Sequence, residues 1–141
     1  MKATCCIVLS LVFLSCKTRP NVDINYLPCD NKFGKQLTKY YRVESDANRA
    51  TILNELDSFV KRDFLSYAAP GKPDPSWLFY RSSNVLKSVK DCATFQQNLF
   101  GTDHIEIAYY TPDGNGDTII RANFDEAGQM IYSSPKYIDV R

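Results

Sequence analysis

The last third of the chain alternates between apolar and polar side chains, and this feature constrains the fold more than any other. Residues 104–111 and 118–124 each repeat with period two, which is typical of strands with one buried face. The Pro, Asp, Gly and Asn residues at 112–117 predict a hairpin turn between them. A second turn at 125–128 ends in glycine and predicts a bulged hairpin to a third strand. Residues 137–141 alternate again and would add an edge strand to this antiparallel meander.

The apolar positions also predict how these strands pair. Placing Thr111 opposite Thr118 puts Tyr109 opposite Ile120 and keeps the apolar sides of the two strands together. The bulged turn then pairs Phe124 with Met130, at the start of the third strand. In this register the buried side of the first strand consists of Ile105, Ile107 and Tyr109.

Two amphipathic helices are predicted to cover the meander. Apolar residues recur every three or four positions over 46–67, with Ser45 as the expected N-cap and a Pro-Gly stop just beyond. The same pattern over 84–99 predicts a second helix, capped by Ser83. The expected fold class is therefore α+β, in which an antiparallel three- to four-stranded C-terminal meander is covered by two amphipathic helices.

The remaining segments give weaker signals. Residues 26–34 are rich in turn formers and predict a loop. Residues 36–43 alternate and suit either a strand or a short helix. The aromatic stretch at 77–80 suits a strand or an extended loop that packs on the core.

The N-terminus carries a positive residue, Lys2, followed by an apolar run from Cys5 to Leu14. A membrane-spanning helix needs about 20 apolar residues, and this run is about half as long, so it predicts a secretory signal peptide. The small residue Ser15 before Cys16 resembles the lipobox of bacterial lipoproteins, with Phe13 where leucine is usual. The resemblance implies cleavage before Cys16, a diacylglyceryl group on its sulfur and acylation of the new amine.

This resemblance implies a signal peptide at 1–15, a lipidated cysteine with a flexible tether at 16–25, and one globular domain at 26–141. Several acyl chains on Cys16 would hold the protein on a membrane of the bacterial cell envelope. The alternative is an ordinary signal peptide, cut near residues 15–18, and a soluble secreted protein.

Charge and cysteine content narrow the choices further. The chain has 17 Lys and Arg against 16 Asp and Glu, so its nearly balanced charge argues against a nucleic-acid partner. Of its five cysteines, two would leave with the signal peptide and Cys16 would carry lipid. Cys29 and Cys92 remain, and in an oxidising compartment they predict a structural disulfide.

The chain contains no familiar motif for a catalytic nucleophile, a nucleotide or a cofactor. His104 is its single histidine, and Glu106 and Arg121 would lie near it on the polar side of the predicted hairpin. This group would be the centre of a small hydrolase, although cross-strand charge pairs are also common on solvated sheet faces.

The turn at 113–117 begins like a calcium-binding loop, with oxygen-bearing side chains at alternate positions. Thr118 stands where such a loop needs glycine, and Phe124 where it needs a bidentate glutamate. A polar hairpin turn explains the same residues, so we predict no metal site and no cofactor and keep a calcium-stabilised secreted module as an alternative.

Aromatic residues give the remaining functional signal. Most rings in a domain of this size fill the core, but exposed ones can stack on sugars or anchor a partner. Trp77 and Tyr110 are the rings expected to be most exposed, with Tyr80 beside them. The expected function is a non-enzymatic envelope lipoprotein that binds a protein or glycan partner through Trp77, Tyr80, Tyr110, His104, Glu106 and Arg121.

Overall fold

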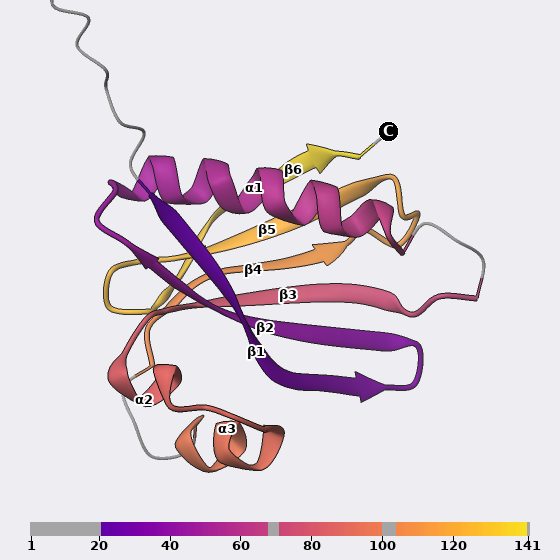
Figure 1. Cartoon of the computed structure of the whole chain (residues 1–141). Coiled ribbons are helices and arrows are strands. Elements are labelled where there is room, and N and C mark those ends of the chain that lie inside the picture. Colours follow the sequence, from indigo (N-terminus) through magenta and orange to yellow (C-terminus); the bar gives the residue numbers. More distant parts are fainter. Residues whose placement is uncertain (1–20, 68–70, 100–103, 141) are drawn as a thin grey trace, which may run out of the picture.

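The computed structural model describes residues 21–67, 71–99 and 104–140, and within them the chain builds one six-stranded mixed sheet (Figure 1). The strands lie in sequence order, β1 to β6, and each neighbouring pair is antiparallel except β2 and β3, which are parallel. The elements are β1 (Val22–Phe33), β2 (Gln36–Ser45), α1 (Arg49–Leu65), β3 (Asp74–Arg81), α2 (Asn84–Lys87), α3 (Cys92–Leu99), β4 (Glu106–Pro112), β5 (Thr118–Phe124) and β6 (Met130–Asp139).

The expected fold class is wrong, because three of the six strands, β1, β2 and β3, precede the predicted C-terminal meander. Residues 26–34 were expected to form a loop, but most of them belong to β1. This strand begins at Val22, so the last part of the expected tether is in the sheet as well. Residues 36–43, which suited either a strand or a short helix, belong to strand β2. The predicted signal peptide and Cys16 lie outside the described residues.

Helix α1 covers one face of the sheet and forms the crossover between the parallel strands β2 and β3 (Figure 1). Its N-cap is Asn48, whose Oδ1 accepts the backbone N–H of Thr51 at 2.9 Å, whereas the predicted cap Ser45 is the last residue of β2. The helix buries Leu53, Leu56 and Val60 against sheet residues that include Tyr41, Phe79 and Tyr110. The predicted helix at 46–67 is therefore confirmed, with a later start.

The second predicted helix is broken into α2 and α3, which cover part of the opposite face (Figure 1). Ser83 caps α2 as expected, since its Oγ accepts the N–H of Leu86 at 3.2 Å. A new helix then begins after Asp91, whose Oδ1 accepts the N–H of Thr94 at 2.7 Å and so caps α3. Because α1 and this pair lie on opposite faces, both faces of the sheet carry apolar clusters.

The disulfide between Cys29 and Cys92 is confirmed and joins β1 to the start of α3. Around it lies the smaller apolar cluster, in which Leu86 and Phe95 from the helices pack on Leu27 and Tyr80 from the sheet. The bridge therefore holds the short helices against the sheet.

The C-terminal hairpin forms, but its register is shifted by two residues. Thr111 pairs with Ile120 and Tyr109 with Ala122, whereas the apolar pattern predicted Thr111 opposite Thr118. The buried side of β4 differs in part from the prediction. Ile107 is buried as predicted, but Ala108 and Tyr110 are fully buried beneath α1, while Tyr109 is only half-buried. The predicted pairing of Phe124 with Met130 is confirmed, and the turn before it has Gly128 at φ 77°.

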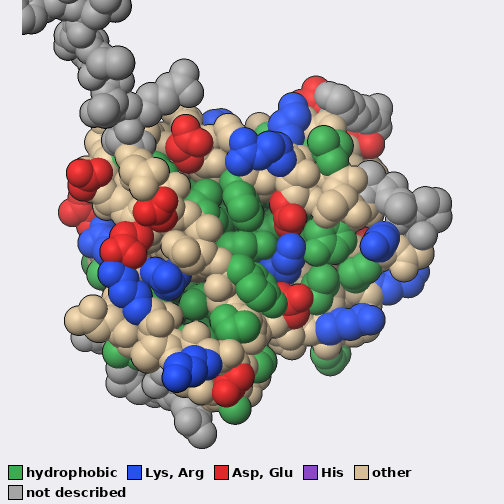
Figure 2. Space-filling model, viewed as in Figure 1, with side chains coloured by type: hydrophobic (Ala, Val, Ile, Leu, Met, Phe, Trp, Pro, Cys, Tyr) green, Lys and Arg blue, Asp and Glu red, His purple; other side chains and the backbone are tan. Residues whose placement is uncertain are grey.

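The surface mixes both charge signs. Figure 2 shows hydrophobic side chains gathered in the middle of the face seen in Figure 1, with positive and negative side chains scattered around and among them. Among the described residues, no helix is long and apolar enough to cross a membrane.

Candidate functional site

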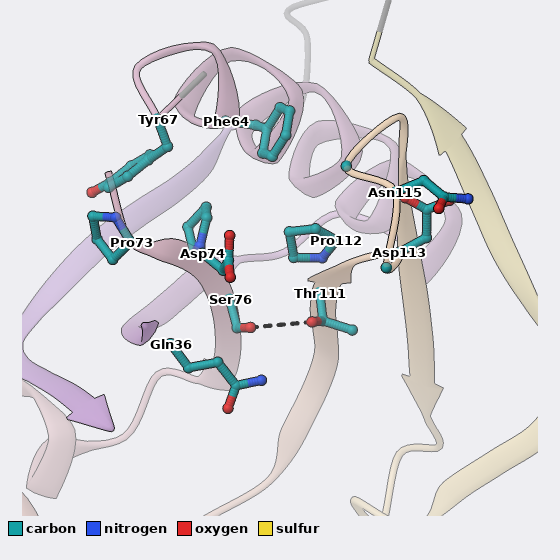
Figure 3. Close-up of a pocket in the computed structure, with 13 residues that line it drawn as sticks. Gln36, Phe64, Tyr67, Pro73, Asp74, Ser76, Thr111, Pro112, Asp113 and Asn115 are labelled. Atoms are coloured by element: carbon teal, nitrogen blue, oxygen red, sulfur yellow. Dashed lines mark hydrogen bonds between the residues drawn. The ribbon is translucent and has the colours of Figure 1, made fainter. Parts of the chain in front are cut away.

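A pocket of about 400 Å³ lies at the end of the sheet where the β4–β5 turn meets the C-terminal end of α1 (Figure 3). Small-ligand sites commonly measure about 300 to 1,000 Å³, so this pocket has room for a small ligand. Its walls come from segments far apart in the sequence. They are Gln36 of β2, Phe64 and Tyr67 of α1 and the turn after it, Pro73 to Ser76 at the start of β3, and Thr111 to Gly116.

The pocket combines aromatic rings with many side-chain oxygens. Figure 3 shows the rings of Phe64 and Tyr67 at the α1 side, and the polar groups of Asp74 and Gln36 at the strand side. Ser76 and Thr111 on neighbouring strands join through their hydroxyl oxygens at 3.3 Å. An arrangement of rings, hydroxyls, carboxylates and amides can contact both the carbon face and the hydroxyl groups of a polar ligand.

Asp113 shapes the turn that closes the pocket. Its Oδ1 accepts the backbone N–H groups of Asp117 at 3.1 Å and Thr118 at 3.3 Å. The Thr118 hydroxyl, followed by these N–H groups, holds the pKa of Asp113 below its usual value. Within residues 21–67, 71–99 and 104–140, no three His, Cys, Asp or Glu side chains gather as a metal site. Asp113, the first residue of the turn that begins like a calcium loop, caps this turn through its bonds to Asp117 and Thr118.

Behind Tyr67, a partly buried polar network ties α1 to the sheet. Asp63 accepts from Lys39 Nζ at 2.9 Å and from Trp77 Nε1 at 2.8 Å. The Lys39 ammonium also lies 5.2 Å from the centre of the Tyr67 ring. Burial lowers the pKa of Lys39, but hydrogen bonds to Tyr67 and Asp63 outweigh it and raise the pKa above its usual value. This network fixes the position of the ring that forms one wall of the pocket.

The expected exposure of Trp77 and Tyr110 is wrong. Both side chains are 0% exposed, and Tyr80 is 3% exposed. Trp77 and Tyr110 face α1, where the hydroxyl of Tyr110 donates to Asp57 at 2.9 Å. Their polar atoms bind carboxylates of the helix, so these rings serve the interior and offer no surface to a partner.

The expected cluster of His104, Glu106 and Arg121 does not form. A bulge at Ile107 is the reason. Glu106 pairs with Tyr80 and shares its face of the sheet, whereas Ala108, the next paired residue after the bulge, pairs with Phe79 on the opposite face. Arg121 therefore faces α1 and donates to Asp57 at 2.7 Å.

His104 and Glu106 instead share the surroundings of Tyr80. The rings of His104 and Tyr80 lie 6.0 Å apart. Burial raises the pKa of Glu106, and burial together with the Glu106 charge raises that of Tyr80. None of these three residues lines the pocket.

Sequence reasoning missed most of the pocket. Tyr67 was the last residue of a predicted helix, and Asp74 lies between that helix and the aromatic stretch at 77–80, where no element was predicted. The one available signal was the concentration of proline and turn residues on both sides of β3 and after β4, which marks where chain reversals gather. No protein-family model, no curated protein and no solved structure matches the chain.

Proposed function

We propose that the chain is a small, lipid-anchored protein of the bacterial envelope that binds a glycan without acting on it. The observation that carries this proposal is the pocket at the β4–β5 turn, whose lining combines the rings of Phe64 and Tyr67 with side-chain oxygens from several strands. The anchor rests on the N-terminal apolar run and on Cys16, which follows a small residue.

Sugars have two kinds of surface, and the pocket offers a partner for each. A pyranose ring presents an apolar C–H face that packs on an aromatic ring, and Tyr67 and Phe64 supply such rings. Its hydroxyl groups both donate and accept, which suits carboxylate and amide side chains such as Asp74 and Asn115.

Asp113 is not suited to act as a general acid in this pocket. A general acid works best when its pKa lies near the working pH. In this pocket the hydrogen bonds to Asp113 lower its pKa, which keeps it ionised and in place as a turn cap. The histidine of the hydrolase alternative, His104, lies outside the pocket beside Tyr80.

A glycan array with the full chain tests the binding proposal, and calorimetry with the best glycan then gives its dissociation constant. Replacing Tyr67→Ala should weaken binding about tenfold or more, because stacking is worth on the order of 1.5 kcal/mol. Asn115→Ala removes an amide from an exposed turn and should also weaken binding. Tyr137→Ala is the matched control, since that ring is 60% exposed outside the pocket.

The outcomes separate the two parts of the proposal. If no glycan binds, or if Tyr137→Ala has the same effect as Tyr67→Ala, the pocket is not a glycan site. The anchor is tested independently by intact mass and membrane partitioning of the wild type beside Cys16→Ala. A mature chain without acyl mass on Cys16 would refute the anchor and favour the secreted alternative.

A further inference from the structure

A second cavity, of about 470 Å³, lies at the other end of α1, beside its N-terminus. Its floor is apolar and contains Val43 and Ile107, which are 3% and 8% exposed. Two positively charged residues, Arg49 of α1 and Arg81 of β3, line the same cavity. An apolar floor below two positive groups is the arrangement that an anion with an apolar body would fit.

The two arginines have no acidic partner among the described residues. Five ion pairs form there, and neither Arg49 nor Arg81 takes part in any of them. The Nη2 atom of Arg49 is buried and makes no hydrogen bond with a described residue. A buried donor without a partner costs free energy, so a ligand oxygen that reaches this guanidinium would offset part of that cost.

The helix end adds to the same field. Arg49 is the first residue of α1, and the partial positive charge of a helix N-terminus favours anions within its first turn. Planar guanidinium groups also match carboxylate and phosphate oxygens in pairs. The charge and the geometry therefore select the same class of ligand.

Glu126 is the opposing charge at this cavity. It lies on the exposed turn between β5 and β6, lines the cavity, and forms no ion pair with another described residue. The two arginines outnumber it, so the ionisable lining carries a net positive charge. Its presence gives a test of opposite sign, because removal of a negative charge should favour an anion.

We propose that this cavity binds an oxyanion, a phosphate or a carboxylate, that is carried by a small apolar group. The location suggests where such a ligand could come from. Ser45 lines the cavity and donates to the backbone oxygen of Asn21 at 2.7 Å. Asn21 is the fifth residue after Cys16, a distance of at most about 18 Å along an extended chain. A lipid headgroup is thus within reach of the cavity. The lipid as the source of the ligand rests on the proposed anchor, whereas the anion site itself does not.

Soluble probes test the site itself. Hexyl phosphate and hexanoate should shift the NMR signals of residues around Arg49 and Arg81 in the full chain, and hexanol should bind at least about tenfold more weakly. Arg49→Gln and Arg81→Gln should each weaken hexyl phosphate about tenfold, because each removes one charge-assisted contact. Glu126→Gln should strengthen it about twofold or more. Arg62→Gln, at the far end of α1, should change nothing.

Three results would overturn the site. These are equal binding of hexanol and hexyl phosphate, an effect of Arg62→Gln that matches that of Arg49→Gln, and weaker binding after Glu126→Gln. The last variant alters an exposed turn, so it keeps the test decisive if an arginine variant fails to fold.

Vesicle flotation then distinguishes the source of the ligand. The full chain with Cys16→Ala should float with phosphatidylglycerol vesicles more than with phosphatidylcholine vesicles, and Arg49→Gln should reduce this difference where Arg62→Gln does not. If Arg49→Gln weakens binding of soluble hexyl phosphate but does not change flotation with vesicles, the anion site stands and the lipid source is refuted. An unmodified Cys16 would refute the anchor, and absence of glycan binding would refute the other pocket, yet neither would alter the soluble-probe result.

Discussion

Arg121 of β5 donates a hydrogen bond to Asp57 of α1 at 2.7 Å, and both side chains are nearly buried, at 8% and 13% exposed. Asp57 also accepts from the hydroxyl of Tyr110 and from the more exposed Lys136 of β6. One carboxylate therefore connects the helix to three neighbouring strands. A buried ion pair of this kind holds the helix and the strands in one orientation. Removing the carboxylate would leave its buried partners without an acceptor, which costs free energy.

Replacing Asp57→Ala should destabilise the fold strongly. The change leaves Arg121 and the Tyr110 hydroxyl buried without their acceptor, and loss of one partner of a buried pair costs about 3 to 5 kcal/mol. Urea unfolding measures the difference. Glu55→Ala, an exposed acid on the same helix, should cost no more than about 0.5 kcal/mol.

A double variant checks the cause of that loss. Asp57→Ala with Arg121→Met should be more stable than Asp57→Ala alone, because the orphaned charge is gone. If the double variant loses more stability than the single one, the cost arises from packing and the ion pair is not its source.

Glu106→Gln should stabilise the protein at neutral pH. Burial raises the pKa of Glu106, so the stability it provides is complete below its unfolded pKa of about 4.3 and is lost as pH rises through the higher folded pKa. Glutamine stays neutral, so the variant should melt at a higher temperature at pH 7 and at the same temperature below about pH 4. Glu55→Gln should show no such gap, and a gap that persists in acid would contradict the explanation.

The spacing of apolar residues along the chain predicted several helices and strands. The arrangement of helices on the two faces of the sheet depends on contacts between distant segments, which this spacing does not contain. The spacing of Leu53, Leu56 and Val60 predicted α1, because these residues meet the sheet directly. The chain at 84–99 has helical spacing as well, but Asp91 caps a new helix and divides it. The apolar periodicity depends only on which residues are apolar. It does not reveal a side chain such as that of Asp91, which binds backbone N–H groups and so begins a new helix.

The faces of the C-terminal strands show the same limit more clearly. On β4 both sides carry apolar residues, so alternation alone could not decide between Tyr109 and Tyr110. Which of the two rings is buried beneath α1 is decided by the bulge at Ile107 and by the helices on the two faces of the sheet. Both features depend on contacts with β3 and its neighbours. The candidate pockets were missed for this reason, since each is assembled from segments that only the crossover brings together.

Removing the disulfide should loosen the short helices before the rest of the sheet. Cys29 and Cys92 are 63 residues apart, and closing a loop of that size is worth about 4 kcal/mol in the chain-entropy model. In the double variant Cys29→Ala/Cys92→Ala, hydrogen exchange should increase in α3 and around Phe95 more than in α1. Equal increases in both helices would show that the bridge stabilises the domain as a whole.

The bond between Trp77 and Asp63 gives a test of how polar contacts inside this core contribute. Trp77→Phe removes the donor to Asp63 Oδ2 and leaves a smaller ring, and we expect a loss of about 3 kcal/mol in urea unfolding. In an Asp63→Ala background the acceptor is already absent, so the same replacement should cost about 1.5 kcal/mol less. Lys39, which shares Asp63 at 2.9 Å, keeps the carboxylate in place in the single variant. If Trp77→Phe costs the same in both backgrounds, the indole contributes through its packing alone, and the position of Tyr67 at the pocket depends on Lys39.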